Sequence, residues 1–136
     1  MCIFCKIING EIPAFKIYED NFVLAFLDIS QVSEGHTLII PKKHCENLFD
    51  VDQETLTHMS QAVKIVVNLL KEKLGVSDIN LINNSGVNAG QTVMHLHFHI
   101  IPRKSDDEID FSFKENEPNF DELNRIHKKL IENKLQ

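Results

Sequence analysis

The chain has 136 residues, of which 43% are hydrophobic and 25% charged, so we expect one globular domain spanning residues 1–136. Its 14 basic and 20 acidic residues give a net charge of −6, which argues against a protein that holds duplex nucleic acid on a basic face. The sequence has no apolar run long enough to span a membrane and no visible secretory signal, and its three cysteines suit no disulfide framework. These features predict a cytoplasmic protein without a membrane contact.

The first half of the sequence predicts a short helix, three strands and one long helix. The short helix ends at Gly10. Two aromatic-rich runs separated by polar turn residues predict a hairpin, and an apolar run closed by Pro41 predicts a third strand. Apolar residues then recur at helical spacing, with Asp52 placed to cap the helix and Gly75 to end it. The expected ranges are 3–9 for the first helix, 15–19, 22–28 and 37–40 for the strands, and 53–74 for the long helix.

The second half predicts two strands separated by a polar, glycine-bearing loop, then an acidic irregular tail and a weakly amphipathic helix. Strands joined by short turns, with a long helix on one face, are typical of an α+β fold with an antiparallel sheet. We expect five antiparallel strands, a core over about residues 2–103 and a C-terminal extension over 104–136. The expected ranges are 79–82 and 93–101 for the strands, 83–91 for the loop, 104–119 for the tail and 121–135 for the last helix.

Three histidines alternate with apolar residues in the last expected strand, His95-Leu96-His97-Phe98-His99. Side chains of an extended strand point alternately to opposite faces, so the three imidazoles would line one surface. Imidazole serves as metal ligand, proton shuttle or nucleophile near neutral pH. Because histidine is a mediocre strand former, strand stability does not account for the row. A polar strand face that happens to be rich in histidine is the weaker interpretation, and the row predicts a functional site.

The polar loop before these histidines contains Asn84 and ends in Gly90-Gln91-Thr92. Glycine allows backbone N–H groups to approach an anion closely. The amide and hydroxyl side chains add neutral donors suited to a phosphate or a ribose. Such a loop alone is more often a plain connection than a site. Beside three imidazoles it predicts phosphate chemistry.

These motifs resemble the histidine triad (HIT) family of nucleotide hydrolases and transferases. The family signature is His-x-His-x-His with apolar x, followed by two apolar residues, and residues 95–101 match it. The resemblance implies an enzyme that acts at the α-phosphate of a purine nucleotide derivative, and a homodimer. Over about residues 2–103, the further matching segments are 24–30, 35–44, 83–84 and 89–93.

The resemblance also implies roles for single residues. His97 would attack the α-phosphorus and form a nucleotidyl-histidine intermediate, which splits one displacement into two easier ones. His99 would donate to the phosphate oxygens, and His36 would hold the imidazoles in position, so both count with the catalytic residues. Gln91 and Thr92 would meet the leaving group or a bridging oxygen. The implied nucleotide-binding positions are Asp28, Ile29, Asn84, Gly90, Gln91, Thr92, His97 and His99.

The N-terminal pair Cys2-x-x-Cys5 has the spacing of half a tetrahedral zinc site. In the bacterial-type branch of the family that carries this pair, the resemblance implies that His44 and His95 complete the site, with one structural zinc per chain. The alternative is a redox dithiol. That motif normally follows a strand, for which a pair this early in the sequence leaves no room.

Two other functions stay open from the sequence. One is a nucleotide-binding regulatory protein with negligible turnover. The other is a hydrolase in which His95, His97 and His99 hold one catalytic metal ion with an open coordination position. For the enzyme, the substrate stays open between a purine nucleoside phosphoramidate and a dinucleoside polyphosphate. The chain has no tryptophan, whereas the phosphoramidate branch often carries one near its C-terminus.

Overall fold

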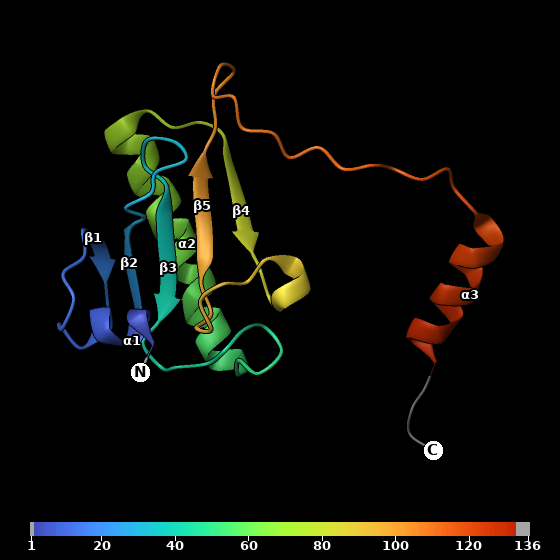
Figure 1. Ribbon diagram of the computed structural model, residues 1–136, viewed down its shortest axis with the longest axis horizontal. Coiled ribbons are helices and arrows are strands. Elements are labelled where there is room, and N and C mark those ends of the chain that lie inside the picture. The colour runs from blue at the N-terminus through green and yellow to red at the C-terminus, as the bar shows by residue number, and fades with distance from the viewer. Residues whose placement is uncertain (1, 133–136) are drawn as a thin grey trace.

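The protein is a five-stranded antiparallel sheet with helices on both faces, and the computed structural model describes residues 2–132 (Figure 1). The strand order is β1-β2-β3-β5-β4, with each neighbouring pair antiparallel. The predicted α+β class is confirmed. The elements are α1 (Ile3–Ile8), β1 (Lys16–Glu19), β2 (Val23–Leu27), β3 (Thr37–Pro41), α2 (Gln53–Leu74), β4 (Ile79–Asn83), the 3-10 helix η1 (Val87–Ala89), β5 (Phe98–Pro102) and α3 (Phe120–Ile131).

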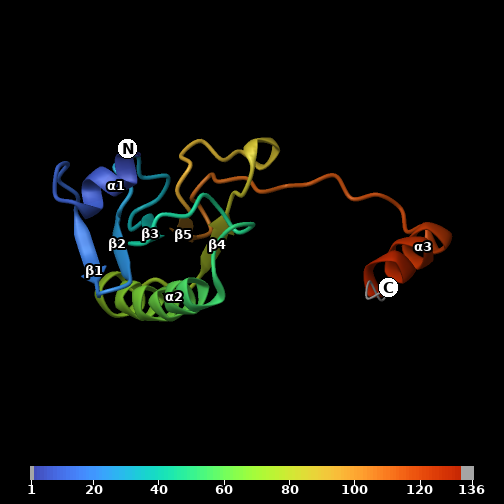
Figure 2. The ribbon, with the colours of Figure 1, turned by 90° about the horizontal axis from the view of Figure 1, so that it is seen from below.

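The long helix α2 has the predicted bounds because both of its caps are encoded locally. The Asp52 carboxylate accepts a hydrogen bond from the Thr55 N–H at 2.7 Å, and Gly75 ends the helix in the left-handed region with a φ of 69°. The buried side of the helix covers β1, β2 and β3 on one face of the sheet (Figure 2). Its buried residues recur every three or four positions: Met59, Ala62, Val66 and Leu70.

The opposite face of the sheet is covered in part by α1. Phe4 and Ile7 of α1 pack with Leu24, Phe26 and Leu38 of the sheet in a second apolar cluster. The sheet is therefore buried on both faces beside α1. The rest of this face carries the histidines.

The last strand is shorter than the predicted range 93–101, because β5 begins at Phe98. Before Phe98 the chain leaves the sheet ladder, and the Leu96 N–H donates to the carbonyl of Cys45 in the loop after β3. Of the three histidines, only His99 lies in a strand. The alternation of faces persists, since Leu96 and Phe98 are buried in the α2 cluster while His97 contacts Phe4 and His99 on the other side.

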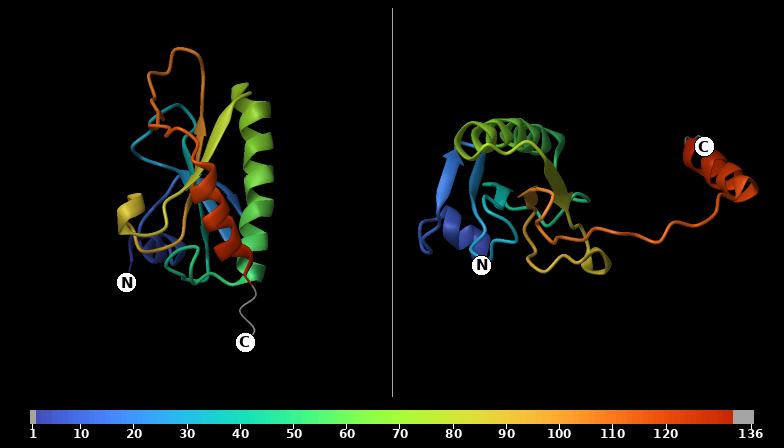
Figure 3. Two further views of the ribbon diagram at one scale, coloured as in Figure 1. Left: turned by 90° about the vertical axis from the view of Figure 1, so that its right-hand side faces the viewer. Right: turned by 90° about the horizontal axis from the view of Figure 1, so that it is seen from above.

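The C-terminal extension leaves the sheet after β5 and carries α3 far from it (Figures 1 and 3). The predicted helix 121–135 begins one residue earlier, at Phe120, and ends at Ile131. Positions 133–135 of that prediction lie outside the described residues. Among residues 2–132, no helix is long and apolar enough to cross a membrane.

Candidate functional site

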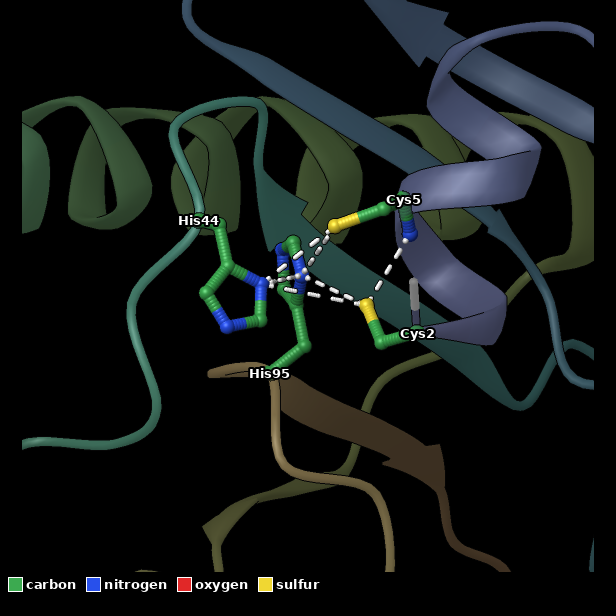
Figure 4. A group of neighbouring side chains, drawn as sticks. All are labelled: Cys2, Cys5, His44 and His95. Atoms are coloured by element: carbon green, nitrogen blue, oxygen red, sulfur yellow. Dashed lines mark hydrogen bonds between the residues drawn. The ribbon is translucent and has the colours of Figure 1, made fainter.

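Four potential metal ligands from distant parts of the chain meet beside α1 (Figure 4). Cys2 caps α1, its Sγ accepting from the Cys5 N–H at 3.1 Å. His44 comes from the loop after β3, and His95 from the segment before β5. Nδ1 of His95 lies 3.3 Å from Sγ of Cys2 and 3.0 Å from Nδ1 of His44, which lies 3.3 Å from Sγ of Cys5. The structure thus brings together the whole predicted ligand set.

The spacing of these atoms suits a tetrahedral ion. Zinc–sulfur bonds of about 2.3 Å and zinc–nitrogen bonds of about 2.0 Å at tetrahedral angles place neighbouring ligand atoms roughly 3.3 to 3.8 Å apart. The other two cross distances, from Cys2 to His44 and from Cys5 to His95, are 3.8 and 3.6 Å. Nε2 of the buried His95 lies 2.9 Å from the Pro41 carbonyl oxygen, so it carries the proton and Nδ1 is the free ligand atom. Thiol and imidazole donors in this arrangement fit zinc.

His97 has a fixed tautomer. Its Nδ1 lies 2.8 Å from the carbonyl oxygen of His95. A carbonyl can only accept, so Nδ1 carries the proton and Nε2 keeps a lone pair. The side chain is buried, and its ring meets that of Phe4 edge-on, with centroids 5.1 Å apart. Nε2 of His97 is therefore available as a nucleophile.

His99 is linked to His36 and Asp28. The Val32 N–H donates to Nδ1 of His36 at 3.4 Å, so His36 carries its proton on Nε2. That Nε2 lies 3.0 Å from Nδ1 of His99 and 3.6 Å from a carboxylate oxygen of Asp28. His99 thus accepts at Nδ1 and keeps its own proton on Nε2, as a donor for a ligand. Burial lowers the pKa of His36, and burial with the neighbouring His97 and His36 lowers the pKa of His99 to about 4.

The lowered pKa of His99 predicts a pH-dependent stability. An unfolded histidine titrates near pH 6.5, so between about pH 6.5 and about 4 the unfolded chain binds a proton that the folded chain does not. Above the pKa of His99 in the unfolded chain, titration of His99 does not change the free energy of unfolding. The free energy of unfolding then falls as the pH drops toward the pKa of His99 in the folded chain. We expect His99→Gln to flatten this fall by up to about 1.4 kcal/mol per pH unit, measured by urea unfolding.

The matched control for that experiment is His127→Gln, at an exposed position of α3. It should reproduce the wild-type pH dependence. Any release of metal at acid pH affects all three proteins alike and cancels in the difference. Parallel stability curves for wild type and His99→Gln would contradict the prediction.

Gln91 is buried, and its side-chain amide forms hydrogen bonds with other groups of the protein. Its Nε2 donates to the carbonyls of Glu46 and Val93 at 2.7 and 3.0 Å. Its Oε1 accepts from the Gly86 N–H at 2.8 Å and from Nδ2 of Asn47 at 3.2 Å. Gln91 therefore ties the loop before β5 to the loop after β3.

The other predicted nucleotide-binding residues are half-buried or exposed. Asp28 follows β2 and lies beside His36, whereas the next residue, Ile29, is 86% exposed. Gly90 adopts a φ of 89°, which favours glycine, and a Cβ at that position would lie 3.9 Å from Nδ2 of Asn84. Thr92 is exposed. The structure thus places Asp28 beside the histidines and Asn84 near the glycine loop.

Asn83 is a positioning residue that the sequence did not single out. Its Nδ2 donates to the backbone carbonyl of His97 at 3.0 Å. Its Oδ1 accepts from the Ser85 hydroxyl at 2.6 Å, and that hydroxyl accepts from the Leu48 N–H at 3.0 Å. The available signal was a polar amide at the last position of the strand, next to the polar loop. Together with the contact between Nδ1 of His97 and the His95 carbonyl, these hydrogen bonds hold the backbone and the ring of His97 in place.

The alternative of one metal held by all three histidines is not favoured. Within residues 2–132, two groups of side chains could hold a metal, and neither contains His97. His95 belongs to the group with the cysteines, and His99 to a group with Asp28 and His36.

Comparison with known proteins identifies the family. The HIT domain matches residues 9–106. The chain is 40% identical over 131 residues to the adenosine 5′-monophosphoramidase of Saccharomyces cerevisiae, a match that covers 96% of this chain and 80% of that protein. A solved structure from Streptococcus mutans matches with a TM-score of 0.91 and 42% identity, over 95% of this chain and 82% of that one.

A second solved structure bears on the metal site. A zinc-bound histidine triad family protein from Mycobacterium smegmatis matches with a TM-score of 0.76 and 36% identity, over 94% of this chain and 91% of that one. This match and the HIT domain over residues 9–106 agree with the fold described above. This chain belongs to the HIT family.

Proposed function

We propose that this protein hydrolyses or transfers the nucleotidyl group of a purine nucleotide derivative, acting at the α-phosphate through a nucleotidyl-histidine intermediate on His97. The observation that carries the proposal is the 2.8 Å contact between Nδ1 of His97 and the carbonyl oxygen of His95, which leaves Nε2 unprotonated. The yeast relative, named an adenosine 5′-monophosphoramidase, supports a nucleotide substrate.

The first step forms a bond from Nε2 of His97 to the α-phosphorus, while the bond from phosphorus to the leaving group breaks and the leaving group departs with its electron pair. The ring, bonded at Nε2 and still protonated at Nδ1, becomes positively charged. The His95 carbonyl stabilises this charge through its hydrogen bond. Water then attacks the same phosphorus, releases the nucleoside monophosphate and regenerates His97. Another nucleophile in place of water would give nucleotidyl transfer.

The neighbouring groups stabilise the phosphate during both steps. His99 donates from Nε2 to a phosphate oxygen, and His36 keeps that ring in the required tautomer. Backbone N–H groups near Gly90 and the exposed hydroxyl of Thr92 meet the phosphate and the leaving group. The proposed nucleotide-binding residues are Asp28, Ile29, Asn84, Gly90 and Thr92 with His97 and His99, while Gln91 holds the loop.

The proposed cofactor is one structural zinc per chain, held by Cys2, Cys5, His44 and His95. Four protein ligands leave no open position, so the ion would supply a cross-link between α1, the loop after β3 and the segment before β5. The homodimer and the cytoplasmic location stay predictions.

We expect the wild-type protein, quenched during turnover of an adenosine phosphoramidate, to carry one covalent nucleoside monophosphate. Intact-protein mass spectrometry measures this adduct, and peptide mapping should place it on His97. Running the experiment with a dinucleoside polyphosphate in parallel identifies the preferred leaving group. Tight binding of AMP without turnover or adduct would instead identify a regulatory nucleotide-binding protein.

A further inference from the structure

The segment between β2 and β3 carries two residues of the histidine site, Asp28 at its start and His36 at its end (Figure 1). Nε2 of His36 lies 3.0 Å from Nδ1 of His99 and 3.6 Å from a carboxylate oxygen of Asp28. The path of residues 28–36 therefore decides how these side chains meet. We call this segment the β2–β3 loop.

The second half of the β2–β3 loop, residues 33–36, is fixed to the body of the protein. The Ser33 hydroxyl donates to the Pro102 carbonyl at the end of β5, at 2.8 Å. Gly35 is buried, and a Cβ at that position would lie 3.1 Å from Cδ1 of Leu74 and 3.3 Å from Cγ of Pro102. This half therefore lies tightly against the ends of β5 and α2.

The first half of the loop, residues 29–32, is exposed. Among the backbone–backbone hydrogen bonds of residues 2–132, none joins residues 29–32 to residues 33–36. From this exposed half, the Val32 N–H donates to Nδ1 of His36 at 3.4 Å. That contact places the His36 proton on Nε2, where it faces His99. An exposed stretch of backbone thus sets the tautomer of a buried histidine.

The side chain of Gln31 joins the two halves of the loop. Its Nε2 donates to the His36 carbonyl at 2.7 Å and to the Asp28 carbonyl at 2.6 Å. Its Oε1 accepts from the Gly35 N–H at 2.8 Å. Three hydrogen bonds from one amide therefore hold the exposed half on the fixed half, directly beside Val32. Because Gln31 is itself exposed, core packing does not account for this arrangement.

We propose that Gln31 is a positioning residue, whose amide holds Asp28 and His36 in the geometry that the proposed reaction needs. His36 then donates to Nδ1 of His99, so that His99 keeps its Nε2–H for the phosphate. Asp28 stays beside the histidines, where the nucleotide would bind. The inference rests on the proposed function for the roles of these groups, whereas the tautomer of His99 is measured without any turnover.

The test uses the full chain with its metal and replaces the amide by a thioether. Gln31→Met nearly keeps the size of the side chain and removes all three hydrogen bonds. We expect adduct formation on His97 in a single turnover to slow about tenfold, and the Kd for AMP to rise about threefold or more. Nitrogen-15 NMR of the imidazoles should show the Nε2–H tautomer of His99 in wild type and a mixture of both tautomers in the variant.

Two further variants complete the test. Gln31→Glu keeps the acceptor for the Gly35 N–H but cannot donate to the two carbonyls, so it should be impaired at least as strongly as Gln31→Met. Gln61→Met makes the same substitution at an exposed position of α2 and should match wild type throughout. Metal content and urea unfolding should stay close to wild type in every variant.

The measurements separate this inference from the proposed function. A wild type that forms no adduct would remove the proposed reaction, and the NMR and AMP titration would still test the role of Gln31. An unchanged His99 tautomer in Gln31→Met would overturn the inference, and so would wild-type AMP affinity together with wild-type rates. A defect that follows loss of metal or unfolding of the variant would also overturn it, because Gln31 would then serve the fold alone.

Discussion

His97→Asn is expected to lower kcat by roughly 10⁴-fold or more, because it removes the nucleophile and leaves only the binding groups. We expect an effect of this size because Nδ1 of His97 bonds to the His95 carbonyl, so that the free lone pair of the ring is on Nε2. Single-turnover kinetics with an adenosine phosphoramidate measure the chemical step, and AMP titration measures binding. We expect the Kd for AMP to change far less than kcat.

The control for this variant is His127→Asn, which makes the same substitution at an exposed position of α3 and should keep wild-type rates. Metal analysis of His97→Asn should still give about one zinc per chain, as in wild type. Loss of the metal in this variant would favour the three-histidine hydrolase instead. Retention of activity within tenfold of wild type would remove His97 from the chemistry.

The second large effect concerns the metal ligands. Cys5→Ser should lose the bound zinc and lower the free energy of unfolding by several kcal/mol, because a structural zinc contributes its binding energy to folding. The ligand set joins α1 to two segments far along the chain, and all three should loosen together. Chemical unfolding and metal content measure the two effects.

Cys45→Ala is the matched control for Cys5→Ser. Cys45 lies next to His44 in sequence but is buried in the α2 cluster, and burial raises the pKa of its thiol to about 11. Its replacement should keep the zinc and cost only the packing of one small side chain. Equal metal content and equal stability for Cys5→Ser and wild type would refute a structural zinc.

Much of the fold follows from local signals. Asp52 and Gly75 define α2 because capping depends on a few adjacent residues, and the apolar spacing between them selects its buried side. The alternation around His97 also survives, although β5 begins only at Phe98. Where a ladder begins depends on the neighbouring strands, and here β4 ends at Asn83, which pairs with Phe98, while the Leu96 N–H bonds to the loop after β3.

The site was predictable only in part, because its contacts join residues that are distant in sequence. Spacing indicated Cys2 and Cys5 as possible metal ligands, but only the resemblance to the HIT family added His44 and His95. The contact of His36 with His99 spans 63 positions. The spacing of residues in the sequence could not reveal that the Gln91 amide forms hydrogen bonds with four backbone and side-chain partners. It also could not reveal that the Asn83 amide donates to the His97 carbonyl.

His95 makes two different contacts. Its ring completes the cluster with Cys2, Cys5 and His44, and its backbone oxygen fixes the tautomer of His97. With the proposed zinc and the proposed role of His97, metal binding and catalysis would be coupled through this single residue. A variant of this protein without Cys2 and Cys5 would need another contact to hold the His95 carbonyl oxygen in place, so that His97 keeps its tautomer.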